Sequence, residues 1–203
     1  MIKWLILKLI YSKLGESHFL IKNKDYGTLF KFNSNILKIK LFYLKFSGKI
    51  HENNFKLDTN ISSNNIKSVL MIFPIEEQDF NVAKYCFKSL FSNSDIEYTY
   101  LINNVFYSSA RFKGQVYGFN YIKKRGKIIL NDNFESENTM NKEFDVIIDL
   151  NSNFMLDIAM IINKLKSNYK IGFKNKYSDL FYNIQFKYNT LEEYYSKINL
   201  MLS

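Results

Sequence analysis

The sequence contains almost no cysteine, proline or glycine: one Cys, one Pro and 7 Gly among 203 residues. A disulfide-stabilised scaffold needs pairs of cysteines, so this class is excluded. Collagen-like chains and disordered Pro/Gly-rich chains need far more Gly and Pro, and a disordered tail would not carry 19 Phe and 15 Tyr. The composition therefore predicts a globular chain that is long enough to bury a hydrophobic core.

Arginine is also scarce, since Arg111 and Arg125 are the only two, although the chain has a net charge of +9. Residues 1–65 hold 11 lysines and 4 acidic residues, whereas residues 66–203 hold 17 basic and 15 acidic residues. The positive charge therefore belongs to the N-terminal arm. Arginine makes the bidentate contacts to phosphate and guanine, so its scarcity disfavours nucleic acid as a partner.

The N-terminal segment Met1–Tyr11 is apolar but is interrupted by Lys8. It is shorter than the roughly 20 apolar residues of a spanning helix, and a signal peptide would need an unbroken apolar stretch and a cleavage site. Two alternatives remain for residues 1–14: docking on an anionic membrane surface, or packing on the body of the protein. We expect a cytoplasmic protein, with the first alternative placing it peripherally on the inner face of the membrane.

Residues 28–46 alternate, with Leu37, Ile39, Leu41 and Tyr43 on one parity, and this period of two predicts a β-strand. The polar run 58–65 then predicts a loop. We therefore expect a domain boundary near residue 65, with a basic arm over 1–65 and an α/β domain over 66–203.

The second part of the chain alternates between buried-strand and helix patterns. The apolar run Ile66–Phe73, stopped by Pro74, is typical of a strand buried on both faces. Further strands are predicted at 95–102, 115–122, 127–131, 144–150, 169–173 and 183–188, and helices at 79–91, 153–165 and 191–202. The predicted fold is α/β: a Rossmann-like, mainly parallel sheet with helices on both faces, preceded by the basic arm.

Most motifs of known active sites are missing. Neither a Gly-x-Gly-x-x-Gly loop nor a Gly-Lys-Ser/Thr loop is present, so no backbone cradle for a dinucleotide or a phosphate is predicted. His18 and His51 both lie in the arm, far in sequence from Cys86. We therefore expect no metal site, no cofactor and no Cys–His nucleophile, and we expect Cys86 to be a buried, inert thiol.

Carboxylates at the ends of predicted strands are the remaining candidates for chemistry, because ligands of open parallel sheets bind beyond the carboxyl ends of the strands. Asp79 begins the first helix and Asp149 ends a strand. Each also has a purely structural interpretation: Asp79 as an N-terminal helix residue, and Asp149 as a partner of the loop that follows it. The predicted site consists of Asp79 as the catalytic candidate and a set of ligand-binding candidates, namely Gln78, Asp149, Asn151, Lys174 and Lys176.

Two segments carry a resemblance to a known family. The stretch Val69–Ala83 resembles the opening of the heptosyltransferases, glycosyltransferase family 9, in which the first strand ends in a Gly-Asp loop before a helix. Phe144–Leu150, a helix and Lys170–Phe173 resemble the later strand, helix and Arg-Ile-Gly-Phe segment of the same half. The resemblance covers residues 66–188. With Tyr177–Asp179 after the Ile-Gly-Phe segment, the chain is also similar to uncharacterised bacterial single-domain proteins of this shape.

The resemblance implies a two-domain GT-B relative that inverts configuration without a metal and uses the loop aspartate, here Asp79, as general base. Gln78 replaces the usual Gly, Phe73 replaces a basic residue, and no donor-binding half is expected after Ser203. The expected function is therefore a stand-alone, non-catalytic domain related to the acceptor-binding half, acting in envelope glycoconjugate assembly. The alternative is an active glycosyltransferase subunit that is completed by a nucleotide-sugar-binding partner chain.

Overall fold

A computed structural model of the chain describes residues 26–50, 66–88, 95–110, 112–123 and 126–202. The chain divides into two units, residues 1–49 and residues 50–203, which are described separately below. The predicted boundary near residue 65 falls within 51–65, and the predicted membrane segment 1–14 falls within 1–25. Both stretches lie outside the described residues.

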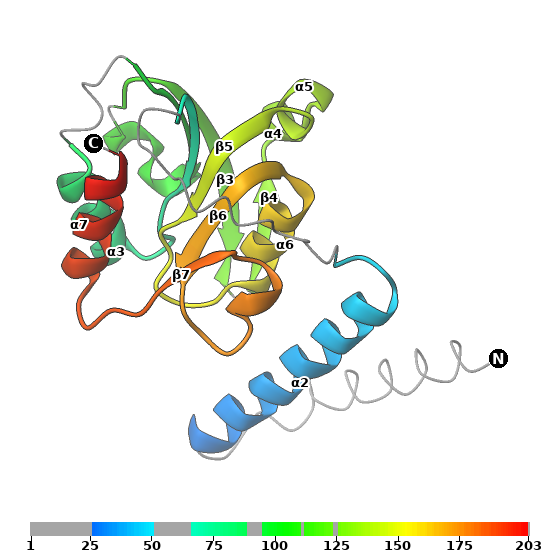
Figure 1. Ribbon diagram of the computed structural model, residues 1–203. Helices are drawn as coiled ribbons and strands as arrows, with labels where there is room; N and C mark the ends of the chain where they lie inside the picture. Colours follow the sequence, from blue (N-terminus) through cyan, green and yellow to red (C-terminus); the bar gives the residue numbers. More distant parts are fainter. Residues whose placement is uncertain (1–25, 51–65, 89–94, 111, 124–125, 203) are drawn as a thin grey trace. The chain divides into compact units, whose positions relative to one another are not determined.

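The first unit contributes one described helix, α2 (Tyr26–Phe46). The second unit contains strands, α-helices and 3-10 helices (η) in the order β1 (Ser68–Ile72), α3 (Glu77–Cys86), β2 (Glu97–Asn103), η3 (Asn104–Ser109), β3 (Gln115–Ile122), β4 (Lys127–Leu130), α4 (Asp132–Glu135), α5 (Glu137–Met140), β5 (Glu143–Asp149), α6 (Leu156–Lys164), β6 (Lys166–Phe173), η5 (Ser178–Leu180), β7 (Ile184–Phe186) and α7 (Leu191–Leu202). Figure 1 shows these elements along the chain.

The strands form one seven-stranded sheet in the order β4-β3-β2-β1-β5-β6-β7. All neighbouring pairs are parallel except the β3–β4 hairpin at one edge. Without β4, the strand order is that of the doubly wound Rossmann-type sheets. In these sheets the strand order reverses between two central strands, which here are β1 and β5. The α/β class and the mainly parallel sheet are confirmed, as are β1 and β5 as interior parallel strands.

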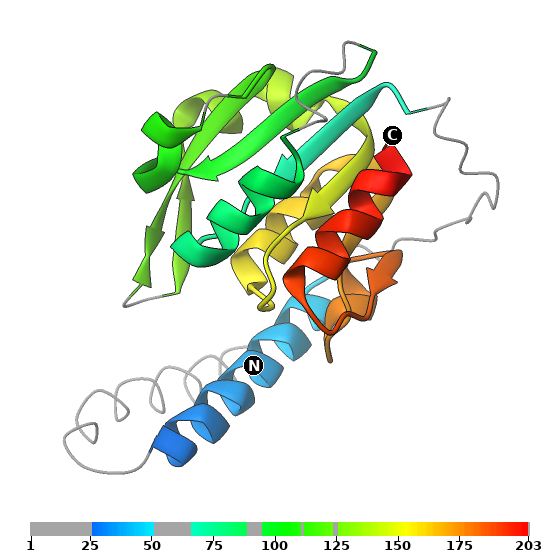
Figure 2. The same cartoon turned by 90° about the vertical axis from the view of Figure 1, so that its left-hand side faces the viewer.

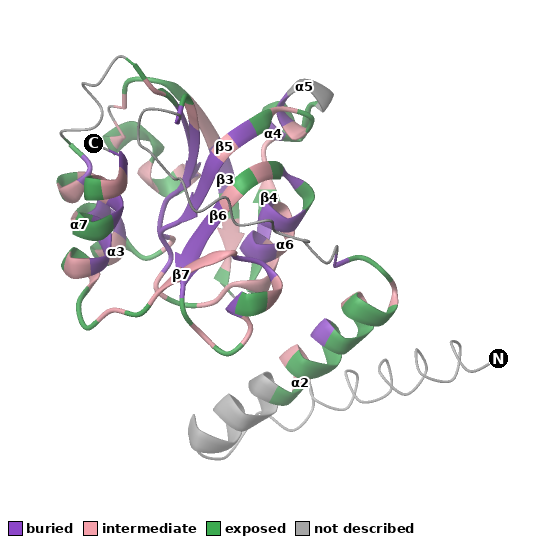
Figure 3. Cartoon of the chain, in the orientation of Figure 1, coloured by how far each residue is buried: buried purple, intermediate pink, exposed green. Residues whose placement is uncertain are grey.

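The central strands are buried because their sequences are almost entirely apolar. Val69, Leu70, Met71 and Ile72 of β1 are all fully buried, and so are Val146, Ile147 and Ile148 of β5. Figure 3 shows this burial over the middle of the sheet. Since successive side chains of a strand point to opposite faces, both faces of the sheet are covered here. The register pairs Ile72 with Asp149, so β1 and β5 end side by side.

One face of the sheet packs on α3 and α7, which lie side by side in Figures 1 and 2. Large aromatic residues fill this layer: Phe73 from the end of β1, Phe80 from α3 and Tyr194 and Tyr195 from α7 are all fully buried. The ring centroids of Phe73 and Phe80 are 5.6 Å apart. Aromatic packing therefore fixes α3 directly behind the carboxyl end of β1.

The strand predicted over 28–46 is wrong, because these residues form helix α2. Two helical stripes overlap in this segment: Leu37, Leu41 and Leu44 follow an i, i+4, i+7 spacing, and Ile39, Phe42, Tyr43 and Phe46 follow an i, i+3, i+4, i+7 spacing. Interleaved on one helix, the two stripes produce an apparent alternation in the sequence.

The predicted elements of the second unit are present, but several of their bounds differ. Helix α3 begins at Glu77 and ends at Cys86, earlier than the predicted 79–91, and residues 89–94 lie outside the described part of the chain. Helix α6 begins only at Leu156, because Met155 before it is in extended conformation. The residues between Asp149 and Leu156 are therefore a loop rather than the first helical turn.

Candidate functional site

A hollow of about 340 Å³ lies where the chain leaves β1 and β5. Residues that follow β1, residues that follow β5 and two residues from the β3–β4 hairpin line it: Pro74, Ile75, Glu76, Asp79, Tyr121, Gly126, Asn151, Ser152, Asn153, Phe154, Met155 and Leu156. The hollow thus sits at the carboxyl ends of the two strands between which the strand order reverses. In open α/β sheets this is the position at which ligands bind.

Asp79 reaches the hollow from the first turn of α3. Its Oδ2 accepts a hydrogen bond of 2.7 Å from the hydroxyl of Ser152, which belongs to the loop after β5. Both side chains are half-buried at the wall of the hollow. The pair ties the first turn of α3 to the loop after β5 at the wall of the hollow.

Asp149 lies deeper than Asp79 and is only 3% exposed. Its Oδ1 accepts from the backbone N–H of Asn151 at 3.0 Å and from the Asn151 side chain at 2.8 Å, and its Oδ2 accepts from the hydroxyl of Tyr182 at 2.6 Å. Burial raises the pKa of Asp149 above its ordinary value, whereas these hydrogen bonds act in the opposite direction. Asp149 therefore anchors the loop after its strand.

Asn151 extends this anchor across the sheet. Its side-chain oxygen accepts from the backbone N–H of Ile75 at 3.1 Å, and the side chain itself is buried. The hydroxyls of Tyr194 and Tyr195 donate to the backbone carbonyls of Asp149 and Leu150, at 3.1 and 2.8 Å. The loop after β1 and the loop after β5 are thereby held together at the base of the hollow.

The β3–β4 hairpin closes another side of the hollow through Tyr121 and Gly126. The backbone N–H of Ile128 in β4 donates to Asp157 in the first turn of α6 at 2.9 Å, which ties the hairpin to that helix. Burial raises the pKa of the Tyr121 hydroxyl, and the carboxylates of Glu76 and Asp157 raise it further. The carboxylates of Glu76 and Asp157 thus lie close enough to this wall to act on the Tyr121 hydroxyl.

The structure brings Asp79 and Asn151 of the predicted site together at the hollow, with Asp149 beneath them. Gln78 is exposed on α3, and Lys174 and Lys176 are exposed in the loop after β6; none of the three is among the residues that line the hollow. The loop after β6 reaches the site indirectly, because the ring centroid of Tyr177 lies 5.7 Å from that of Phe154 in the lining.

The sequence interpretation missed Ser152, Asn153, Glu76 and Tyr121. Residues 151–153 are three polar residues directly after a buried strand, and this pattern could have indicated a site. The predicted helix began at residue 153, earlier than α6 does, and this start obscured the pattern. Tyr121 offered no such signal, because its hairpin reaches the hollow only through the tertiary fold. Glu76 precedes the first residue of α3 and makes no side-chain capping hydrogen bond.

Within the described ranges, no group of three or more His, Cys, Asp or Glu side chains gathers in a way that could hold a metal ion. Cys86 is half-buried at the end of α3, and burial, followed by the charge of Glu192, raises the pKa of its thiol. A raised pKa disfavours the nucleophilic thiolate.

Comparisons of the chain with protein-family models, with curated proteins and with solved structures found no match.

Proposed function

We propose that the second unit is a Rossmann-like binding domain, with helices on both faces of its sheet, that holds a neutral, hydroxyl-rich ligand such as a sugar in the hollow beyond β1 and β5. The observation that carries the proposal is the lining itself: carboxylate, amide and hydroxyl groups from Glu76, Asp79, Ser152 and Asn153 converge on one hollow. Such groups accept from and donate to sugar hydroxyls.

The charge of the lining supports a neutral ligand over a phosphorylated one. Among the described residues of the hollow, two are acidic and none is Lys or Arg. Phe73 stands where the resembling family has a basic residue at the end of its first strand, and its ring is fully buried against Phe80. The phosphates of a nucleotide diphosphate would meet two carboxylates and no Lys or Arg among the described lining residues.

With the resemblance to the heptosyltransferases, this makes the domain a stand-alone, non-catalytic module related to their acceptor-binding half. It would present a saccharide acceptor during envelope glycoconjugate assembly, in the cytoplasm at the inner face of the membrane. The chain by itself would transfer no sugar from a nucleotide donor.

Titration of the full chain with mannose, a manno-heptose and inorganic phosphate, followed by NMR or calorimetry, tests this function. We expect both sugars to bind and phosphate not to bind. Asp79→Asn should weaken sugar binding about tenfold or more, because a hydrogen bond to a charged group is lost. Asp132→Asn makes the same change in the first turn of α4, outside the lining, and should have no effect. Phosphate binding without sugar binding would refute the proposal.

A second candidate function is an active, inverting, metal-independent glycosyltransferase subunit with Asp79 as general base. It is favoured by the position of Asp79 in the wall of the hollow, since a general base must lie within hydrogen-bond reach of the hydroxyl it deprotonates. This candidate requires a nucleotide-sugar-binding partner chain. Sugar transfer by the co-purified pair that disappears in Asp79→Asn would establish it, and transfer unaffected by that change would exclude it.

A further inference from the structure

Helix α2 of the first unit carries an apolar stripe that faces solvent. Ile39, Phe42, Tyr43 and Phe46 are 48%, 71%, 37% and 70% exposed. Their i, i+3, i+4, i+7 spacing places them on one side of the helix, in a stripe about 100° wide. We refer to these four residues as the α2 stripe.

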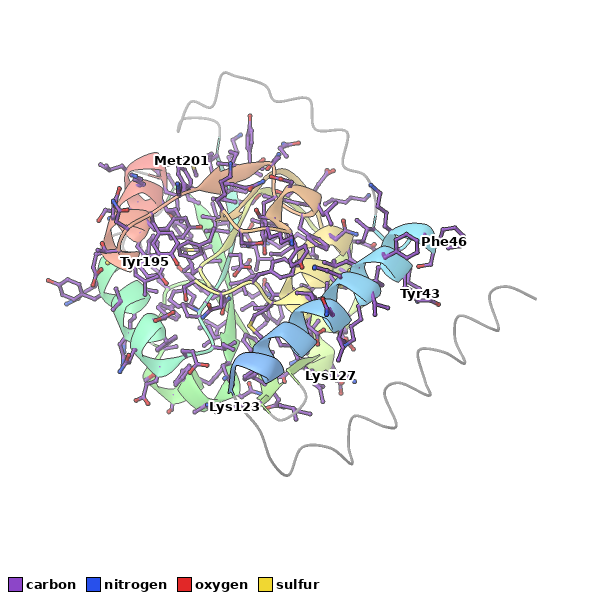
Figure 4. All side chains as sticks on the ribbon, turned by 90° about the horizontal axis from the view of Figure 1, so that it is seen from below. Tyr43, Phe46, Lys123, Lys127, Tyr195 and Met201 are labelled. Atoms are coloured by element: carbon purple, nitrogen blue, oxygen red, sulfur yellow. The ribbon has the colours of Figure 1, made fainter. Side chains whose placement is uncertain are left out.

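The α2 stripe is distinct from the apolar side that the helix already buries. Leu41 is buried, and it lies on the opposite side of the helix from the stripe. The rings of Phe42 and Phe46 stack on each other with centroids 6.3 Å apart and an interplanar angle of 13°. Figure 4 shows Tyr43 and Phe46 projecting outward from α2. The stripe is thus an ordered aromatic surface rather than a set of scattered apolar residues.

Lysines border the α2 stripe on both sides. Lys38 and Lys40 flank Ile39 in sequence, so they lie about 100° from it in opposite directions around the helix. Both are exposed, as is Lys45, which lies on the same side of the helix as Lys38. No acidic residue occurs between Tyr26 and Phe46. The helix therefore combines an apolar stripe with borders of one sign of charge.

We propose that the α2 stripe docks on the surface of an anionic lipid bilayer, with the helix lying in the plane of the interface. Phenylalanine, tyrosine and isoleucine side chains enter the boundary between headgroups and acyl chains, and lysines beside them extend their ammonium groups to anionic headgroups. No helix among the described residues has the length and apolar character needed to cross a bilayer. The surface mode is the one that a single apolar stripe fits.

The charge of α2 favours an anionic bilayer over two other binding partners, a second copy of the chain and a nucleic acid. A second copy of the chain, packed stripe to stripe, would bring two lysine borders together without an acidic partner from either α2, which is repulsive. A nucleic acid would match the lysines but would leave Ile39 and much of the stripe in water, since bases stack on single rings. An anionic bilayer satisfies the whole stripe and its borders together.

This inference is independent of the ligand in the hollow, and it concerns residues other than the predicted membrane segment 1–14. The test is co-sedimentation of the full chain with vesicles of phosphatidylcholine alone and of phosphatidylcholine with phosphatidylglycerol. We expect binding only to the anionic vesicles, weakened by added salt because exposed charges are screened. A variant that lacks residues 1–14 should retain binding through α2.

Two double variants test the two components of the surface. Phe42→Ser/Phe46→Ser should weaken binding about tenfold or more through lost apolar burial. Lys38→Gln/Lys40→Gln should weaken it about thirtyfold, since each lysine near an anionic surface contributes about a fivefold change. The matched controls Tyr85→Ser/Val105→Ser and Lys88→Gln/Lys113→Gln change exposed residues of the second unit and should bind as the unaltered chain does.

Circular dichroism and thermal unfolding of each variant show whether the fold is retained, and Phe42→Tyr/Phe46→Tyr, which keeps the aromatic stripe, should restore binding. The proposal is overturned by equal binding to neutral vesicles, by full binding of both α2 variants, or by loss of binding on removal of 1–14 alone. A lipid-free dimer that the serine variant dissociates, or an oligonucleotide bound in place of vesicles, would also overturn it.

Discussion

Replacement of Tyr182 by Phe removes one hydrogen bond from the buried carboxylate that anchors the base of the hollow. The Tyr182 hydroxyl donates to Oδ2 of Asp149 at 2.6 Å, and both side chains are 3% exposed. The ring stays in place, so the substitution changes neither the packing of Tyr182 nor the two hydrogen bonds that Asn151 gives to the other carboxylate oxygen. The measured change in stability therefore reports this single contact.

Hydrogen bonds to charged groups stabilise proteins by about 1.5–3 kcal/mol, and an acceptor left buried without its partner brings the loss toward the upper end. We therefore expect Tyr182→Phe to lower the free energy of unfolding by about 2–3 kcal/mol near neutral pH. For a domain of this size, about 1 kcal/mol corresponds to 2–4 °C in Tm, so the loss is on the order of 4–12 °C.

The loss should depend on pH in a defined direction. The Tyr182 hydrogen bond lowers the pKa of Asp149 against the larger effect of burial, so its removal raises the folded-state pKa further. The folded variant then binds its proton more tightly than the folded wild type does, and its stability falls more steeply as pH rises. The loss of unfolding free energy in the variant, relative to the wild type, is therefore complete above the variant's Asp149 pKa and shrinks as pH falls through that pKa.

Urea unfolding at several pH values between about 4 and 8 measures this dependence. Tyr195→Phe is the matched control, because its hydroxyl donates at 2.8 Å to the neutral backbone carbonyl of Leu150 at the same end of β5. It should cost about 1 kcal/mol at every pH. A Tyr182→Phe deficit that is constant with pH, or no larger than that of the control, would refute the reasoning about Asp149.

Three further predictions concern other close contacts of the second unit. Gly172→Ala should lower the free energy of unfolding by about 2–3 kcal/mol, because a Cβ there would lie 2.7 Å from the Tyr182 ring. The control Gly126→Ala lies in open space at φ +57° and should lower it by about 1 kcal/mol. Equal losses of stability in thermal unfolding would contradict this prediction. Gly118→Ala should lower the free energy of unfolding by about 1–3 kcal/mol, because its Cβ would overlap the side-chain carboxamide of Asn104. The NMR resonances of that side-chain amide should shift, and unshifted resonances would count against the prediction. Lys170→Met should stabilise the protein by about 1 kcal/mol below pH 8, after allowance for solvent screening, because burial lowers the pKa of Lys170 from 10.5 to about 8. Since Lys170 binds its proton more weakly in the folded state, this advantage should disappear as pH rises to about 10.5, and Tm measured against pH would show whether it does.

The central strands could be predicted from sequence because burial on both faces leaves an uninterrupted apolar run. Val69–Ile72 and Val146–Ile148 are such runs, and they lie in the two strands between which the strand order reverses. A strand-end position for Asp149 followed directly from the second run. Local sequence patterns thus largely predict the location of the hollow, because the topology of a parallel sheet places it at the carboxyl ends of these strands.

The structural interpretation of Asp149, as a partner of the loop that follows it, is what the structure shows, but its burial and its contact with Tyr182 could not be predicted in the same way. Whether a strand-end carboxylate faces a cavity or the core depends on its partners, and Tyr182 lies 33 residues further along the chain. Tyr121 joins the hollow from a hairpin that pairs on the far side of β2. Helix α2 was missed for a different reason: its exposed stripe and its buried side are both apolar, so the sequence lacks the single polar face that identifies an ordinary surface helix.

The polar groups at the carboxyl end of this sheet fall into two layers with different capacities. In the lower layer, Asp149 and Asn151 are buried and bound to Tyr182 and to the Ile75 backbone, so their hydrogen-bonding capacity is used in joining two loops. In the upper layer, Asp79 and Ser152 are half-buried and line the hollow. A ligand that displaced the lower layer would break the base of its own site, whereas one that met Asp79 would leave the base intact. Because the lower layer holds both loops in place without occupying the hollow, the carboxylates that can serve a ligand here are those of Glu76 and Asp79.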